Sequence, residues 1–247
     1  MMDPTQQEKI NNNLKALQRN IAAAAERSGR RAEEIEIMAV TKTLPAETVR
    51  AAIKAGIRLF GENRVQEAEL KYTELAAAKS EEAFRLHLIG HLQRNKAGKA
   101  ARLFDCVQSI DKYETAERLQ QTCETAGRKL DILLELNTSA EDTKSGFSTE
   151  KELRACLERI LTLDRLRVRG LMTVGPWTDD RQRIRAAFAA LKLLYDDLRA
   201  QGLDWDTLSM GMSGDYETAV EEGSTLIRIG TALFGQRPSS CTVPKQG

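Results

Sequence analysis

The sequence predicts an α/β protein built as a (β/α)8 TIM barrel with an extra N-terminal helix. Short apolar runs alternate with longer segments of helical periodicity, and 247 residues is the length that a single barrel of this kind usually fills. The runs lack strict polar alternation, as expected for parallel strands buried on both faces. An open doubly wound sheet is the alternative for the same pattern. Eight runs are present: Ile35–Val40, Arg58–Gly61, Phe84–Gly90, Cys106–Ile110, Ile132–Asn137, Val168–Met172, Leu208–Met212 and Leu226–Ile229.

The extra helix is expected over Thr5–Ser28, where apolar residues recur at intervals of three and four, and Gly29 is placed to end it. Pro45 suits the first turn of the next helix. We treat residues 1–247 as one domain, because the chain shows no linker or repeat, and residues 238–247 as a loose tail. Helical periodicity predicts further helices over Pro45–Ala55, Thr115–Ala126, Glu150–Leu161 and Asp180–Ala200.

Composition favours a cytoplasmic protein without nucleic-acid or membrane partners. The 37 basic and 36 acidic residues give a net charge of +1, and the basic residues are scattered among acids rather than gathered in a stripe. No apolar stretch reaches the roughly 18 residues of a membrane helix, and the polar N-terminus does not resemble a secretory signal. Because no two cysteines have CxxC or metal-like spacing, reduced thiols are expected at Cys106, Cys123, Cys156 and Cys241.

Active sites of such barrels lie where the strands end. The first apolar run is followed by Lys42, which can project over the barrel mouth. A partly desolvated lysine has a lowered pKa and can form a Schiff base with an aldehyde, although most lysines are solvated surface residues. Asn63 follows the second run and either donates to a ligand oxygen or caps the next helix. The two histidines, His87 and His91, lie on a strand and its loop without an evident third ligand, so no metal site is expected.

Small-residue turns follow the last two predicted strands, where barrels of this class often bind phosphate. Residues 211–214, Gly-Met-Ser-Gly, form the first turn, and Gly230 with Thr231 forms the second. Glycines let backbone N–H groups approach an anion, a helix N-terminus favours its charge, and Ser213 and Thr231 add hydroxyl donors. Ordinary turns have the same composition, so the pair of turns, rather than either alone, indicates a site.

Arg228 stands inside an otherwise apolar strand, and a buried guanidinium needs a partner. That partner is either a carboxylate on a neighbouring element or an acceptor on a ligand inside the barrel.

Together these residues resemble those of the pyridoxal phosphate homeostasis proteins, a family of single-domain proteins that bind pyridoxal 5′-phosphate (PLP). The similarity runs from about Asn11 to Arg237. Its segments are Ala39–Lys42, Phe60–Asn63, His87–Gln93, Lys144–Gly146, Arg169–Met172, Gly211–Ser213 and Arg228–Thr231 through Phe234–Gly235.

The resemblance implies a barrel like the N-terminal domain of alanine racemase, with PLP held as a Schiff base on Lys42. It implies a phosphate cradle from Ser213, Gly230 and Thr231, to which we add Met212 and Gly214 of the same turn. By the same resemblance Arg228 faces the pyridine nitrogen and Asn63 contacts the ring side. An arginine cannot accept a proton, so the nitrogen stays neutral and stabilises a carbanion weakly.

The resemblance favours a PLP-binding protein of intracellular vitamin B6 homeostasis without strong catalysis of its own. Racemases of this barrel type take a catalytic base from a second domain, and we expect none beyond Arg237. Expected partners are PLP and apo forms of PLP-dependent enzymes, and a monomer is the expected state. One alternative is an amino-acid racemase or lyase of weak activity, and another is an interaction protein with a structural cofactor. A Schiff-base aldolase would place its lysine on a later strand.

Overall fold

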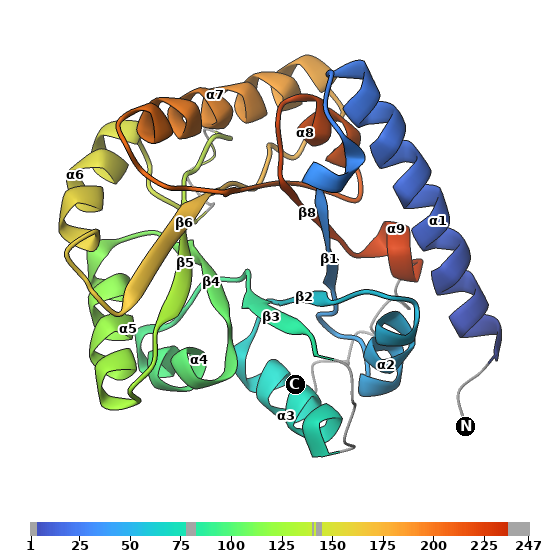
Figure 1. The fold of residues 1–247 in the computed structure, drawn as a ribbon, viewed down its shortest axis with the longest axis horizontal. Helices are drawn as coiled ribbons and strands as arrows, with labels where there is room; N and C mark the ends of the chain where they lie inside the picture. The colour runs from blue at the N-terminus through green and yellow to red at the C-terminus, as the bar shows by residue number, and fades with distance from the viewer. Residues whose placement is uncertain (1–3, 78–82, 140, 142–144, 237–247) are drawn as a thin grey trace, which may run out of the picture.

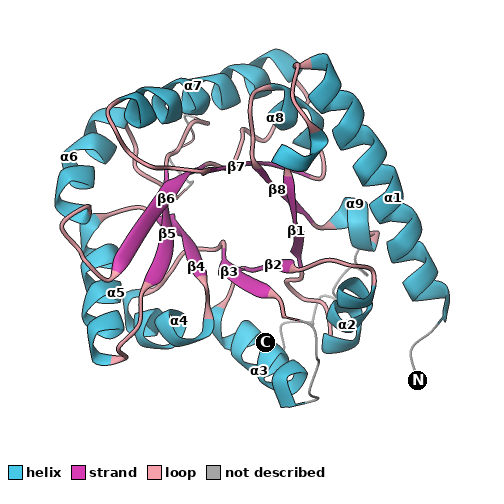
Figure 2. Ribbon diagram, in the orientation of Figure 1, coloured by secondary structure: helices cyan, strands magenta, loops and turns pink. Residues whose placement is uncertain are grey.

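The computed structural model describes residues 4–77, 83–139, 141 and 145–236, and these form a closed barrel of eight parallel strands in sequential order. Figures 1 and 2 show the strands as a central ring with helices around it. The closed ring confirms the predicted barrel and excludes the open sheet. The strands are β1 (Glu36–Val40), β2 (Leu59–Glu62), β3 (Arg85–Leu88), β4 (Cys106–Ile110), β5 (Leu130–Glu135), β6 (Leu166–Met172), β7 (Thr207–Met212) and β8 (Leu226–Ile229).

Helices connect successive strands and cover the outside of the ring. Their apolar faces pack on the outward-facing side chains of the strands and form one large buried core. The helices are α1 (Pro4–Arg27), α2 (Ala46–Lys54), α3 (Val65–Ala77), α4 (Ala97–Leu103), α5 (Tyr113–Thr125), α6 (Glu150–Ile160), α7 (Arg181–Ala200), α8 (Tyr216–Glu221) and α9 (Thr231–Phe234), with short 3-10 turns at Ala32–Glu34 and Arg94–Lys96.

Helix α1 precedes the barrel, as predicted, and lies along α8 and α9 on its outside (Figure 1). Its apolar stripe is buried, and the Asn13 amide donates to the carbonyl of Leu233 at 2.8 Å. The chain leaves the helix through Gly29, whose φ of 68° is the left-handed conformation expected of a helix-ending glycine. The first helix therefore packs beside the last helices, outside the ring that the pairing of β1 with β8 closes.

Two details differ from the sequence-based expectation or lie beyond it. Pro45 does not enter the first turn of α2: its ψ of 163° is extended, so it is the residue before the helix. Lys144 and the predicted tail, residues 238–247, lie outside the described residues. Within the part of the chain that is described, no helix has the length and apolar character needed to span a membrane.

Gly170 in β6 is required by close backbone packing. Its φ is 150°, and a Cβ atom added there would lie 1.8 Å from the carbonyl oxygen of Thr207 in β7. The pairing of β5 with β6 shifts register next to this residue. A side chain at Gly170 would force β6 and β7 apart.

We therefore expect Gly170→Ala to lower the free energy of unfolding by about 3 kcal/mol or more, through backbone strain and a steric clash. Gly98→Ala in α4 is the matched control, because a Cβ atom there meets nothing within 4 Å. That substitution should be neutral or stabilising by up to about 1 kcal/mol. Urea unfolding of both variants tests this, and equal stabilities would contradict it.

Candidate functional site

Lys42, Asn63 and Gly230 lie at neighbouring strand ends on one mouth of the barrel. Strand β1 pairs with β2 on one side and with β8 on the other, and Ala39 is in register with both Phe60 and Ile229. Lys42 follows the end of β1 by two residues, whereas Asn63 and Gly230 directly follow β2 and β8. The structure thus brings together residues that are almost 190 positions apart in the sequence.

The backbone around Lys42 is fixed and strained. The buried Thr41 donates its N–H to the carbonyl of Gly61 at 3.0 Å, which continues the β1–β2 pairing past the strand end. Thr43 then adopts a φ of 63°, in the left-handed region that β-branched residues rarely enter. Such a conformation costs on the order of 1–3 kcal/mol, and persists only where surrounding contacts impose it. Lys42 itself is half-buried between these two residues.

Asn63 faces a cavity rather than capping α3. Among the described residues its side-chain amide makes no hydrogen bond, so the capping role considered from the sequence is not observed. Gly90 follows β3 so closely that an added Cβ would lie 2.3 Å from the carbonyl oxygen of Asn63. The cavity measures about 680 Å³ and is lined by Asn63, Arg64, Val65, Gln66, Glu67, Gly90, His91, Gln93 and Lys96.

The turns after β7 and β8 are joined through one hydroxyl group. The Oγ atom of Ser213 accepts hydrogen bonds from the N–H groups of Gly230 and Ala232, both at 3.2 Å. Gly211, with a φ of 94°, lets the chain turn against α8, since a Cβ there would lie 2.5 Å from that of Ala219. The two predicted phosphate turns therefore form one connected surface.

Three other N–H groups of these turns find no acceptor among the described residues. Met212 donates to the Asp215 carboxylate at 2.5 Å, whereas the N–H groups of Ser213, Gly214 and Thr231 donate to nothing in the described part of the chain. The helices that follow have only 6 and 4 residues. Because the macrodipole of so short a helix is small, anion binding here would depend on N–H and hydroxyl donors. The helix N-terminus invoked from the sequence contributes little.

Arg228 lies inside the barrel with only 4% of its surface exposed. Its two terminal nitrogens donate to the Ser209 hydroxyl and to the Thr173 carbonyl, both at 2.7 Å. The sequence left a carboxylate or a ligand as its partner, and the hydrogen bonds instead reach neutral protein acceptors. Burial lowers the pKa of Arg228 to about 10, while Asp215 and Glu135 oppose that shift. The guanidinium therefore stays charged at neutral pH.

A directional chain of hydrogen bonds runs from Arg228 across the barrel interior. Arginine only donates, so the Ser209 hydroxyl accepts from Arg228. The same hydroxyl donates a hydrogen bond to the side-chain carbonyl oxygen of Gln108 at 2.7 Å. The Gln108 amide lies 2.9 Å from Nδ1 of His87, which then accepts. Burial lowers the pKa of His87 to about 3, so the ring is neutral. This chain fixes the guanidinium, and neither Ser209 nor Gln108 was singled out from the sequence.

His87 and His91 lie in different parts of the barrel and have different partners. His87 lies inside the barrel, whereas Nδ1 of His91 lies 3.2 Å from the carboxylate of Asp111 at the mouth. No group of three His, Cys, Asp or Glu side chains suited to a metal ion occurs among the described residues.

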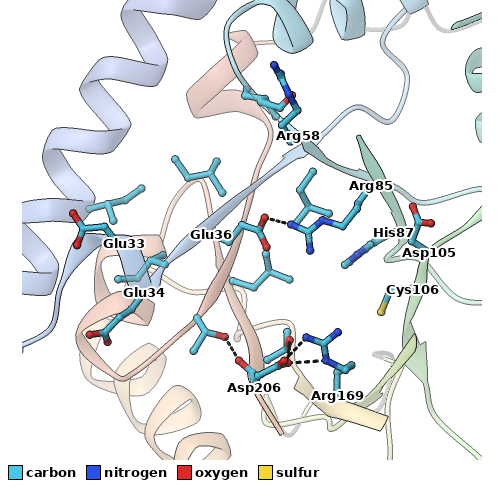
Figure 3. Close-up of a pocket in the computed structure, with 18 of the residues that line it drawn as sticks. Glu33, Glu34, Glu36, Arg58, Arg85, His87, Asp105, Cys106, Arg169 and Asp206 are labelled. Carbon is cyan, nitrogen blue, oxygen red and sulfur yellow. Dashed lines mark hydrogen bonds and ion pairs between the residues drawn. The ribbon is translucent and has the colours of Figure 1, made fainter. Parts of the chain in front are cut away.

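A second cavity, of about 960 Å³, opens at the other mouth, where the strands begin (Figure 3). Its charged side chains are largely engaged with one another: Arg85 pairs with Glu36, and Arg169 pairs with Asp206 and, at 2.7 Å, with Asp131. None of the predicted site residues lines it. In barrels of this class that face serves stability rather than chemistry.

Glu135, at the end of β5, is a titratable group that the sequence analysis missed. It is only 5% exposed, and burial raises the pKa of its carboxyl to about 7, with Arg228 opposing the shift and Asp111 adding to it. The sequence does offer a signal for it, namely an acidic residue near the end of an apolar run. An acid–base group that is half-ionised near neutral pH thus belongs to the same mouth as Lys42.

Because the folded-state pKa of Glu135 lies above the unfolded value of 4.5, its ionisation disfavours the fold. The free energy of unfolding should fall as pH rises from about 5 through 7. Glu135→Gln lacks this loss, so its stability relative to the wild type should rise by up to roughly 3 kcal/mol between pH 5 and 8. Urea titrations across that range test this, with the exposed Glu114→Gln as control. A pH-independent difference would refute it.

Comparison with known proteins gives the site a context. The family model described as alanine racemase, N-terminal domain, matches residues 12–238. The structure of PipY from Synechococcus elongatus with PLP bound is 37% identical, with a TM-score of 0.78, and the match covers 92% of this chain and 100% of that one. An alanine racemase of Clostridium difficile, at 16% identity and a TM-score of 0.75, shares the fold, and the match covers 94% of this chain and 58% of that one.

Curated relatives match over nearly their full length. The pyridoxal phosphate homeostasis protein of Pseudomonas aeruginosa is 42% identical over 92% of this chain and 96% of its own. That of Escherichia coli K12 is 40% identical over 94% and 98%. This chain therefore belongs to the pyridoxal phosphate homeostasis proteins, within the family defined by the alanine racemase N-terminal domain.

Proposed function

We propose that this protein binds PLP at the mouth formed by its strand ends, and serves intracellular PLP homeostasis by holding and releasing the cofactor without strong catalysis. The observation that carries the proposal is the convergence of Lys42, the two joined turns and a charged Arg228 on one barrel mouth. The name of the curated relatives and the PLP-bound PipY structure agree with this assignment.

The residues present fit the chemistry of the group. The unused N–H groups of Ser213, Gly214 and Thr231 are donors suited to a phosphate, with Gly230 and Met212 completing the turns. The unbonded Asn63 amide is available to the ring side. When bound, PLP supplies an aldehyde that combines reversibly with amines and a ring that withdraws electrons.

Lys42 is proposed as the covalent anchor. Lys42 would hold the aldehyde of PLP as a Schiff base, in which a C=N bond to Nζ replaces the C=O bond and the oxygen leaves as water. Nothing is oxidised or reduced, and water or another amine reverses the step. A Schiff base of this kind both retains the cofactor and permits its release.

The presence of Arg228 favours a protein that holds PLP over one that uses PLP for catalysis. A guanidinium that is already charged would donate a hydrogen bond to the pyridine nitrogen of PLP and could not give it a full proton. The ring is then a weaker electron sink. The Ser209 and Thr173 contacts would hold Arg228 in one orientation while it makes that bond.

A weak amino-acid racemase or lyase is the second candidate, and Glu135 is the observation that favours it. Burial raises the pKa of Glu135 to about 7, which suits proton transfer at neutral pH. Turnover of D- and L-amino acids at ordinary enzyme rates would favour this candidate over the first.

Reduction of the PLP-loaded protein with borohydride should leave a pyridoxyl group on the tryptic peptide that contains Lys42, detected by mass spectrometry. Lys42→Ala should lose the adduct and the visible absorption, with affinity for PLP lowered at least about tenfold. Lys54→Ala, at the exposed end of α2, is the control and should keep both. An adduct on another lysine in the wild type would refute the anchor.

The proposed acceptors are apo forms of PLP-dependent enzymes in the cytoplasm, where the free thiols Cys106, Cys123 and Cys156 would remain reduced. Mixing the PLP-loaded protein with such an apo-enzyme should restore the enzyme's activity. Activation should be faster than the release of PLP into buffer that contains a phosphatase trap. Equal rates would mean that PLP passes only through free solution, and would exclude directed delivery.

A further inference from the structure

Both peptide groups that flank Lys42 are held by one pair of side chains on α3. The carbonyl of Thr41 accepts from Nζ of Lys71 at 2.6 Å, and the N–H of Thr43 donates to Oε1 of Glu67. Glu67 and Lys71 are one helical turn apart and contact each other at 3.1 Å. The two bonds therefore close a clamp around the backbone of Lys42.

The clamp is anchored in the core between the sheet and α3. The side chain of Lys71 is 6% exposed, and its Nζ lies 2.7 Å from Oε1 of the fully buried Glu62. The Thr41 hydroxyl donates to the same oxygen at 2.8 Å and lies 3.0 Å from the Tyr72 hydroxyl. A buried ion pair such as that of Lys71 with Glu62 gains little net stability over apolar side chains of similar size. What they supply is a defined geometry.

The left-handed Thr43 directly follows the residue that the clamp surrounds. Its φ of 63° turns the chain directly after Lys42 and leaves its N–H pointing at Glu67. The N–H group that Glu67 accepts from belongs to the peptide that joins Lys42 to Thr43, so this bond fixes the orientation of that peptide plane. With the Thr41 carbonyl held by Lys71, both peptide planes beside Lys42 are fixed, and with them the direction in which its side chain leaves the backbone.

We propose that Glu67 and Lys71 are positioning residues that aim the Lys42 amine at the aldehyde of PLP. This inference rests on the proposed function, because it assumes that Lys42 is the covalent anchor. Neither residue needs to touch PLP: each acts through a peptide group next to Lys42.

The test separates covalent capture from phosphate binding with two probes. PLP carries the aldehyde, whereas pyridoxine 5′-phosphate has the same ring and phosphate but cannot form the imine. Glu67→Ala and Lys71→Met should slow the appearance of the imine absorption with PLP by about tenfold or more, since small misplacements of a reacting group cost rates of that size. Affinity for pyridoxine 5′-phosphate should stay within about twofold of the wild type.

Conservative and surface variants complete the design. Glu67→Gln keeps an oxygen that can accept from Thr43, so its imine should form faster than that of Glu67→Ala. Lys99→Met breaks an exposed ion pair with Glu69, 2.6 Å long, between α4 and α3, and should match the wild type. If Lys71→Met fails to fold because Glu62 is left buried and unpaired, the less buried Glu67 still decides the outcome.

Wild-type imine formation with unchanged rates in Glu67→Ala would overturn the inference and leave the proposed function standing. An equal loss of affinity for both probes would also overturn it, because the cluster would then be merely structural. A wild-type protein without an adduct on Lys42 would instead refute the proposed function itself.

Discussion

Closure of eight parallel strands is the constraint on which the rest of this molecule depends. In a closed parallel barrel every strand ends on the same rim, so residues from distant parts of the sequence meet without any loop having to reach for them. Lys42, Asn63, Glu135 and Gly230 come to the same rim for this reason alone. The same closure produces a second rim, where acidic and basic side chains are largely paired with each other. The proposed PLP site therefore belongs to one rim only.

The interior of the barrel holds several buried polar side chains that are joined in an ordered chain of hydrogen bonds. Buried polar groups are costly unless each finds a partner. Here Arg228, Ser209, Gln108 and His87 satisfy one another in a single direction across the barrel. Such a chain tolerates few alternative arrangements, so the guanidinium enters the candidate site in a fixed orientation. A carboxylate in the place of Ser209 would also bind Arg228, but it would neutralise the charge that the site presents.

The barrel, its strands and the N-terminal helix follow from apolar periodicity, because burial on both faces of a strand leaves a clear pattern in the sequence. Residues at strand ends could be named for the same reason. The partners of Arg228 could not, since Ser209 and the Thr173 carbonyl are chosen by packing across the barrel. Glu67 and Lys71 read in the sequence as an ordinary surface pair at helical spacing. Only the docking of α3 against β1 and β2 shows that they are turned inward. Pro45 was expected in the first turn of α2 but lies one residue before it. Its extended ψ could not be anticipated from its residue type.

The position of α1 has a consequence for how the chain acquires its structure. This helix is made first, yet its hydrogen bonds reach Tyr216 and Leu233, about 200 residues later. During synthesis its bonds to α2, from Gln6 to Thr48 and from Gln7 to Ala51, can form early, but its bonds to the last two helices must wait until the final strand has emerged. Contacts of such large sequence separation form slowly, because a long loop must close first. The seam between the beginning and the end of the chain lies directly behind the turns after β7 and β8. The part of the site proposed to hold phosphate is therefore expected to become ordered last.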